Sequence, residues 1–327
     1  MNGDAALIED FLAGKPRALA RAISRSEAGN GAAVVRAVYD RTGRAMTIGL
    51  TGPPGVGKST LSGALVRIAR AAGKTVGVVS VDPSSPFSHG AILGDRIRLT
   101  EHFTDPDVFI RSMASRGHLG GLAGATGDAV ALMDAFGKDV VLVETVGVGQ
   151  SEVEIAELAD TTLVTLQPGS GDSVQLLKAG ILEVADVFVV NKADHPMAQH
   201  LQREIRSMME MLDFRGWVPR LVATQANEGI GVKELWDAIL AHREYLAQSG
   251  ALDEKRRAAF AHQARALALG RIERRLDAEV VRLERTRSGE SDPYAAADRI
   301  IAAVTLPETE EALEAPPPSL RATVKGL

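Results

Sequence analysis

Cysteine is absent from all 327 residues of the sequence. The chain therefore forms no disulfide bonds and cannot hold a metal ion through thiolate ligands. The chain also lacks an excess of positive charge. It has 37 lysine and arginine residues and 42 aspartate and glutamate residues, which gives a formal net charge of −5. A nucleic-acid scaffold needs the opposite balance, so we expect no nucleic-acid partner.

Long apolar runs are missing too, although 45% of the residues are hydrophobic. No stretch approaches the roughly 20 apolar residues that a membrane-spanning helix needs, so we expect no membrane partner. The N-terminal segment carries Asp4, Glu9 and Asp10, which suits neither a secretory nor a transit peptide. We therefore expect a cytoplasmic protein.

The pattern of residue types divides the chain into four regions. Residues 1–45 have apolar residues at helical spacings and are expected to form an N-terminal helical extension. Residues 46–245 alternate apolar strands with helices, which is typical of an α/β domain on a mainly parallel sheet. Residues 246–305 are expected to form a C-terminal helical arm, and residues 306–327 a disordered tail. The expected strands begin near Thr47, Thr75, Val108, Val140, Thr161, Val187 and Leu221.

A glycine-rich segment lies between the first expected strand and a helix. It reads GPPGVGKST and matches the phosphate-loop pattern G-x-x-x-x-G-K-[ST] in the required context. The glycines let backbone N–H groups point at phosphates, and the helix N-terminus favours an anion. Lys58 should reach the outer phosphates and Ser59 should ligate Mg²⁺; the alternative is a glycine-rich turn without a ligand. The expected phosphate-binding residues are Gly52, Pro53, Pro54, Gly55, Val56, Gly57, Lys58, Ser59 and Thr60.

A second motif, Asn191-Lys192-Ala193-Asp194, follows the apolar strand near Val187. Asp194 can accept hydrogen bonds from N1–H and the exocyclic amine of guanine, whereas adenine would leave this carboxylate unpaired. Asn191 can contact the base edge and tether the phosphate loop, and the Lys192 stem can lie along the purine. Backbone N–H groups of Gln225, Ala226 and Asn227 lie where one could bond the guanine carbonyl oxygen. The two motifs together predict a domain that binds GTP and hydrolyses it slowly.

Acidic residues close to strand ends are candidates for the Mg²⁺ site. Asp82 ends an apolar strand and could hold the metal, or it could cap the next turn. Asp95 is a second candidate, with a solvated helix face as its alternative. Glu144 ends another strand and begins an E-x-x-G motif, in which it would hold the metal shell or orient the attacking water. Gly147 would then sense the γ-phosphate through its backbone N–H.

The residues around these candidates predict a slow reaction and a further mobile segment. Val148 stands directly after Gly147, where a glutamine could have oriented water, and Gln150 comes later. We therefore expect a low intrinsic rate that a partner or a loop movement completes. Residues 167–180 contain two glycines and a proline, and they form either a third switch segment or simply the loop into the next helix.

Five segments together resemble one family, the methylmalonyl-CoA mutase-associated GTPases called MeaB or ArgK. They are GPPGVGKST (52–60), VDPSSPFSHGAILGDRIRL (81–99), RSMASRGHLGGL (111–122), ETVGVGQSE (144–152) and QPGSGDSVQLLKAG (167–180). The resemblance extends from the N-terminal helices to about residue 305. It implies a P-loop GTPase domain with a mainly parallel sheet, flanked by N-terminal and C-terminal helical extensions.

The resemblance also implies a role and partners. Proteins of this family gate delivery of adenosylcobalamin to methylmalonyl-CoA mutase and protect the mutase, which in turn stimulates GTP hydrolysis. A homodimer through the C-terminal helices is implied as well. By motif position, Lys58 and Ser59 carry over to phosphate and Mg²⁺, and Lys178 becomes a candidate contact to the catalytic groups. No residue pattern resembles a cobalamin site, so we expect Mg²⁺ with GTP or GDP but no directly bound cobalamin.

Three other functions compete with this one. A nickel-delivering GTPase shares the phosphate loop and the E-x-x-G motif, but it normally carries cysteines, and His195 and His200 are poorly spaced as a helical pair. A kinase of a transport component would need an acceptor site, and Asn191 to Asp194 argue for GTP rather than ATP. A nucleotide-sensing module without catalysis is the third. A simple measurement of nucleotide preference separates the kinase from the GTPase.

Overall fold

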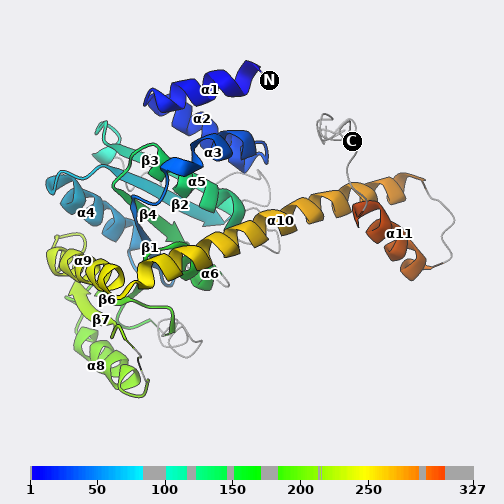
Figure 1. The fold of residues 1–327 in the computed structure, drawn as a ribbon. Coiled ribbons are helices and arrows are strands. Elements are labelled where there is room, and N and C mark those ends of the chain that lie inside the picture. Colours follow the sequence, from blue (N-terminus) through cyan, green and yellow to red (C-terminus); the bar gives the residue numbers. More distant parts are fainter. Residues whose placement is uncertain are drawn as a thin grey trace, which may run out of the picture. The chain divides into compact units, whose positions relative to one another are not determined.

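The computed structural model describes residues 2–83, 101–115, 123–145, 151–170, 183–212, 214, 216–286 and 292–305. Within these ranges, one sheet of seven strands occupies the centre of the first part of the chain (Figure 1). The strands are β1 (Met46–Thr51), β2 (Val76–Pro83), β3 (Val108–Ser115), β4 (Val140–Thr145), β5 (Thr161–Leu166), β6 (Val187–Asn191) and β7 (Arg220–Thr224). Each begins within one residue of the predicted start.

Every paired neighbour in the sheet is parallel, in the order β3-β2-β4-β1-β5-β6-β7. All residues of β1, β4, β5 and β6 are buried, which explains why apolar residues occur on both faces of these strands. In register, Leu50 of β1 lies opposite Glu144 of β4, and Thr51 lies opposite Val164 of β5. The carboxyl ends of these strands therefore meet at one edge.

Helices cover both faces of the sheet. On one face, α4 (Lys58–Ala71) and α9 (Val232–Ser249) pack Leu61, Leu65 and Trp236 against alternate residues of the strands. The other face carries the remaining helices of this part of the chain (Figure 1). They are α1 (Asn2–Leu12), α2 (Pro16–Glu27), α3 (Ala32–Val38), α5 (Ala123–Ala135), α6 (Ser151–Leu158) and α8 (Ala198–Met209), with a short 3-10 turn at Tyr39–Arg41.

The predicted N-terminal extension is helical and amphipathic. Leu7, Phe11 and Leu19 are almost fully buried, and the Phe11 ring meets Phe136 edge-on at 5.2 Å between centroids. Leu12, one of the apolar residues at helical spacing, is instead 47% exposed. Proline stands at the start of α2, where its missing N–H would have no helical partner in any case.

The C-terminal helices follow Gly250, which has a left-handed φ of 76° and separates α9 from α10 (Ala251–Thr286). The chain divides after Leu267 into two compact units. The second unit contains the end of α10 and α11 (Pro293–Thr305), where Arg275 donates to the Ala303 carbonyl oxygen at 3.3 Å. The predicted division at residue 245 stays a prediction, and the tail 306–327 lies outside the described residues. No helix in the described ranges has the length and hydropathy to cross a membrane.

The first turns of α10 are fixed to the amino-terminal edge of the sheet by two basic residues. Arg256 donates to both carboxylate oxygens of Asp160 at 3.0 Å, and Lys255 donates to Asp186 at 3.0 Å. Asp160 directly precedes β5, and Asp186 directly precedes β6. Asp160 also accepts the backbone N–H of Thr47 at 3.0 Å. The base of α10 is thus joined to the start of three strands.

Candidate nucleotide-binding site

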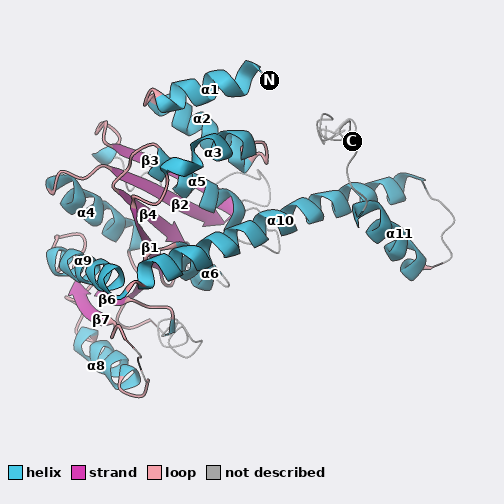
Figure 2. Ribbon diagram, viewed as in Figure 1, coloured by secondary structure: helices cyan, strands magenta, loops and turns pink. Residues whose placement is uncertain are grey.

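The predicted site residues gather at the carboxyl edge of the sheet, where the arrowheads of Figure 2 end. Residues 52–57 follow β1, residues 167–170 follow β5, residues 192–195 follow β6 and residues 225–227 follow β7. Open parallel sheets bind their ligands at this edge. Chain order and sheet order together therefore bring four separate loops to one place.

The phosphate loop has a conformation that only glycine allows at two positions. Gly52 has a φ of 139°, and a Cβ atom there would lie 2.0 Å from the Thr165 carbonyl oxygen. Gly57 has a φ of 95°, and its added Cβ would lie 2.5 Å from Asn191 Nδ2. Helix α4 begins at the next residue, Lys58. The loop therefore opens directly into a helix N-terminus, which is the geometry that suits a phosphate group.

Lys58 is buried, and its ammonium group lies inside the loop. Its Nζ donates to the carbonyl oxygen of Gly52 at 2.6 Å and to that of Pro53 at 2.9 Å. The loop thus supplies local acceptors that hold a cation where the sequence predicts the outer phosphates. A lysine on a flexible stem can exchange such carbonyl partners for phosphate oxygens without leaving the loop.

A cluster of buried oxygen groups lies beside the loop. Ser59 Oγ donates to Glu144 Oε1 at 2.6 Å, and Ser62 Oγ donates to Glu144 Oε2 at 2.9 Å. Glu144 comes from the end of β4, and both serines come from the first turns of α4. Hydroxyl and carboxylate oxygens are the hard ligands that Mg²⁺ accepts, so Ser59 and Glu144 fit the predicted ion. Ser62 was not predicted, although its spacing of three from Ser59 places both on one helix face.

The remaining metal and catalytic candidates are described only in part. The backbone of Asp82 belongs to β2 and pairs with Ala114, next to the tip of β4, where Val81 pairs with Thr145. Its side chain is outside the described structure. Asp95, Gly147 and Lys178 lie outside the described residues, so their predicted roles stay predictions.

Asn191 is the point at which three loops meet. Its Nδ2 donates to the Val56 carbonyl oxygen of the phosphate loop at 2.8 Å. Its Oδ1 accepts from Thr224 Oγ1 at 3.0 Å and from the Ala226 N–H at 3.2 Å. The residue is 3% exposed. The predicted tether to the phosphate loop is present, and the Ala226 N–H, predicted as a contact to guanine, is engaged by Asn191 here.

Residues 192–195 after β6 form the base-recognition turn, and backbone hydrogen bonds hold both this turn and the turn after β7 in place. The Ala193 N–H donates to the Thr224 carbonyl oxygen at 3.0 Å, and the Gln225 N–H donates to the Ile230 carbonyl oxygen at 3.0 Å. Asp194 is exposed on this turn, and no hydrogen bond or ion pair links its side chain to another described residue. Asn227 lies in the turn that follows β7. The carboxylate acceptor that guanine recognition needs is therefore accessible.

Lys192 bridges two loops. Its φ of 56° is left-handed, which is uncommon for a residue with a side chain. Its Nζ donates to the Gly55 carbonyl oxygen at 2.9 Å and to Gln167 Oε1 at 2.6 Å. The sequence predicts a stem along the purine, but it does not predict the contact with Gln167, which is 25 residues away in the chain.

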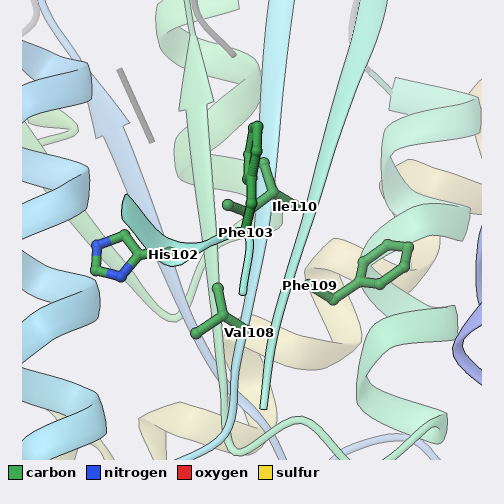
Figure 3. Close-up of a pocket in the computed structure, with 5 residues that line it drawn as sticks. All are labelled: His102, Phe103, Val108, Phe109 and Ile110. Carbon is green, nitrogen blue, oxygen red and sulfur yellow. The ribbon is translucent and has the colours of Figure 1, made fainter. Parts of the chain in front are cut away.

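A separate cavity of about 280 Å³ lies at the edge strand β3 (Figure 3). His102, Phe103, Val108, Phe109 and Ile110 line it, with His102 on the α4 side and Phe109 on the opposite side of the strand. The ring Nε2 of His102 lies 3.2 Å from the Gly63 carbonyl oxygen of α4. Val108 begins β3, so the cavity lies at the amino end of its strand. It is not part of the edge where the predicted nucleotide residues gather.

The fold and the phosphate loop define the class of P-loop GTPases, and comparison with known proteins gives the family. The profile of the methylmalonyl Co-A mutase-associated GTPase MeaB family matches residues 17–280. The chain belongs to this family.

Comparison with individual proteins agrees with this family assignment. One relative is a protein of Pyrococcus abyssi that is named as a GTPase. It is 47% identical over 307 residues, which cover 90% of this chain and 95% of its own. The mitochondrial methylmalonic aciduria type A homolog of Mus musculus is 38% identical over 214 residues, covering 64% of this chain and 52% of its own. Among solved structures, one described as a LAO/AO transport system kinase has a TM-score of 0.67 at 25% identity and covers 94% of this chain and 99% of its own.

Proposed function

We propose that the protein binds and hydrolyses GTP as a chaperone that gates adenosylcobalamin delivery to methylmalonyl-CoA mutase and protects that enzyme. One observation carries the guanine assignment. Asn191 ties the phosphate loop to the turn after β7 through Val56 and Ala226, while the carboxylate of Asp194 remains accessible on the base-recognition turn. A purine with an N1–H donor would pair with this carboxylate, and adenine would not.

The assignment of the phosphate end of the site also rests on the contacts of its side chains. Ser59 and Glu144 would hold Mg²⁺, with Asp82 and Asp95 as further candidates. Bound Mg²⁺ would neutralise charge on the β- and γ-phosphate oxygens. Lys58 would turn from the carbonyl oxygens of Gly52 and Pro53 to the outer phosphates.

The catalytic roles go beyond these contacts. Glu144 would orient water or hold the metal shell, and Gly147 and Lys178 are the remaining catalytic candidates. With Val148 after Gly147 there is no glutamine in the usual water-orienting place. We therefore propose that the intrinsic rate is low and that the mutase supplies or orders the missing group.

The partner assignment rests on the family name and on the names of relatives. The family is named for its association with methylmalonyl-CoA mutase, and the mouse relative is named for methylmalonic aciduria. Cobalamin itself would be bound by the mutase and not by this chain. A homodimer would form through the C-terminal helices, where Ile272, Val280 and Ile301 are between 41% and 56% exposed.

The test is GTP turnover by the purified protein with and without methylmalonyl-CoA mutase, with ATP as a control. We expect slow GTP turnover, acceleration by the mutase and no turnover of ATP. Lys58→Ala should abolish both the basal and the stimulated rate, which shows that the stimulation acts through this site. GTP turnover that is indifferent to the mutase would contradict the chaperone role.

A kinase of a transport component is the second candidate, favoured by the description of the similar solved structure. It predicts phosphate transfer from ATP to a protein acceptor in the same assay. ATP turnover that exceeds GTP turnover would favour it over the proposed GTPase.

A further inference from the structure

Two turns that are distant in sequence pack against each other on the base side of the candidate site. Lys192 Nζ lies 2.6 Å from Gln167 Oε1, and the His195 ring approaches Gly169 closely enough that an added Cβ would lie 3.4 Å from its Cε1. Gly169 has a left-handed φ of 75°. The turn after β5 therefore contacts the base-recognition turn at two points, by a polar contact and by close packing.

The Lys192 ammonium joins three segments at once. It donates to Gly55 in the phosphate loop and to Gln167 after β5, while its own backbone belongs to the turn after β6. Among the described residues other than glycine, Lys192 alone has a positive φ. Such a conformation costs about 1 kcal/mol or more and persists where the surroundings fix it, often at ligand sites. The two acceptors of the ammonium are part of those surroundings.

A lysine side chain on a surface turn has four rotatable bonds and loses considerable entropy when it is fixed. An acceptor at each side of the ammonium restricts the stem to one path across the base side of the site. A glutamine achieves this without adding a negative charge next to nucleotide phosphates, whereas an aspartate or glutamate would add one. Gln167 is only partly exposed and directly follows a buried strand, so its own backbone is held in place by the sheet.

We propose that Gln167 is a positioning residue for guanine-nucleotide binding, which holds Lys192 over the purine by accepting a hydrogen bond from its ammonium group. The inference rests on the proposed function of the site and adds a residue to it. Because Gln167 and Lys192 act at the base, their effect is equal for GDP and GTP. If the two residues acted at the γ-phosphate or the metal, their substitution would instead weaken the binding of GTP more than the binding of GDP.

The test is a double-mutant cycle on nucleotide affinity in the full-length protein, measured with fluorescent GDP and GTP analogues. Gln167→Met keeps the length of the side chain and removes the acceptor, and Lys192→Met keeps the stem and removes the ammonium. We expect Gln167→Met to weaken GDP and GTP equally, by about three- to tenfold. In the Lys192→Met background the same change should cost less than about twofold, because the partner is already gone.

Gln199→Met is the matched control, because Gln199 is an exposed glutamine on α8. It should match the wild type in affinity, and its melting temperature should equal that of Gln167→Met. Equal losses from Gln167→Met in both backgrounds, a loss for GTP alone, or an affinity within twofold of the wild type would each overturn the inference while leaving the proposed function standing. A wild-type protein that binds neither guanine nucleotide would overturn the proposed function and this inference together.

Discussion

At the scale of single residues, the site depends on contacts that tolerate no added atoms. Gly57 and Gly73 both have left-handed φ values, 95° and 74°, yet their surroundings differ. An added Cβ at Gly57 would lie 2.5 Å from Asn191 Nδ2, whereas at Gly73 nothing lies within 4 Å. The two positions therefore separate backbone strain from damage to the Asn191 tether.

Gly57→Ala should lower GTP affinity by more than about tenfold, because the methyl group displaces Asn191 from the phosphate loop. Gly73→Ala should cost only the strain of a left-handed alanine, about 1–2 kcal/mol of stability, with unchanged affinity. Nucleotide titration and thermal unfolding of both variants make the comparison. Equal GTP affinities of the Gly57→Ala and Gly73→Ala variants would show that GTP binding does not need the contact of Asn191 with the phosphate loop.

Ser62 is the residue of the oxygen cluster that the sequence did not reveal. It is fully buried and donates to one carboxylate oxygen of Glu144, while Ser59 donates to the other. Ser62→Ala should let Glu144 turn, so that GTP turnover falls and needs more Mg²⁺ for half-maximal rate. The loss of stability should be about 1–2 kcal/mol.

The measurement for Ser62 is GTP turnover as a function of Mg²⁺ concentration, with Glu144→Ala as the stronger variant. A Mg²⁺ dependence identical to that of the wild type would show that Ser62 has only a structural role. Turnover unchanged in Glu144→Ala would remove Glu144 from the site altogether.

At the scale of elements, the contact between Arg256 and Asp160 joins the start of α10 to the sheet. Asp160 is 5% exposed at its side chain, and Arg256 bonds both of its oxygens as well as the carbonyl oxygens of Gly43 and Ala45. Hydrogen bonding to Asp160 raises the pKa of Arg256 above its ordinary value, so the arginine keeps its charge. Removing the arginine would leave a nearly buried carboxylate without its cation.

Arg256→Ala should destabilise the protein by about 2–4 kcal/mol for that reason. Its neighbour Arg257 is exposed and makes no contact with the sheet edge, so Arg257→Ala should lie within about 0.5 kcal/mol of the wild type. The midpoints of urea unfolding of the three proteins test this. Similar midpoints for both variants would mean that α10 is held by packing alone.

His242 of α9 adds a dependence on pH at the same edge. It is 1% exposed, its Nδ1 lies 2.9 Å from Thr161 Oγ1, and its Nε2 lies 3.3 Å from Asp186. Burial lowers the pKa of His242 below its ordinary value of 6.5, and Lys255 lowers it further, against the opposing effects of Asp186 and Asp160. Below pH 6.5 the unfolded chain therefore binds this proton more readily than the folded one.

The stability that His242 contributes is thus complete above pH 6.5 and is lost as the pH falls below that value. His242→Gln should unfold with a smaller fall in melting temperature between pH 8 and pH 5.5 than the wild type shows. The two proteins share every other histidine, so the difference isolates this residue. Parallel curves for the two proteins would contradict the assignment.

The strands followed from the sequence, and so did the contact of Asn191 with the phosphate loop, but the other contacts between elements did not. Buried parallel strands are recognisable because they are continuous apolar runs between turns, as at Val187 to Val190. Lys192 and Gln167, or Arg256 and Asp160, are joined only through the order of strands in the sheet. That order depends on packing between distant segments, and no local pattern encodes it. The charge-dense start of α10 is an example, because Lys255 and Arg256 bind the sheet edge while their neighbour Arg257 is exposed.

At the scale of the whole molecule, the proposed dimer is tested by mass. Side chains at Leu269, Ile272 and Val280 on α10 are between 38% and 46% exposed. Ile272→Glu would place a charge in this apolar surface, so it should convert a particle of twice the 34.6 kDa chain mass into a monomer. Arg274→Ala, on an exposed polar position of the same helix, should stay dimeric. Light scattering after size exclusion makes the measurement, and a monomeric wild type would refute the dimer.

The central claim is that the turn after β6 reads guanine, and Asp194→Asn tests it most directly. Xanthine carries a carbonyl oxygen where guanine carries its exocyclic amine, so an amide in place of the carboxylate offers the donor that xanthine needs. The account predicts that Asp194→Asn binds GTP at least about tenfold more weakly than the wild type and gains affinity for XTP, with ATP bound by neither protein. A GTP affinity within twofold of the wild type, without any gain for XTP, would contradict it.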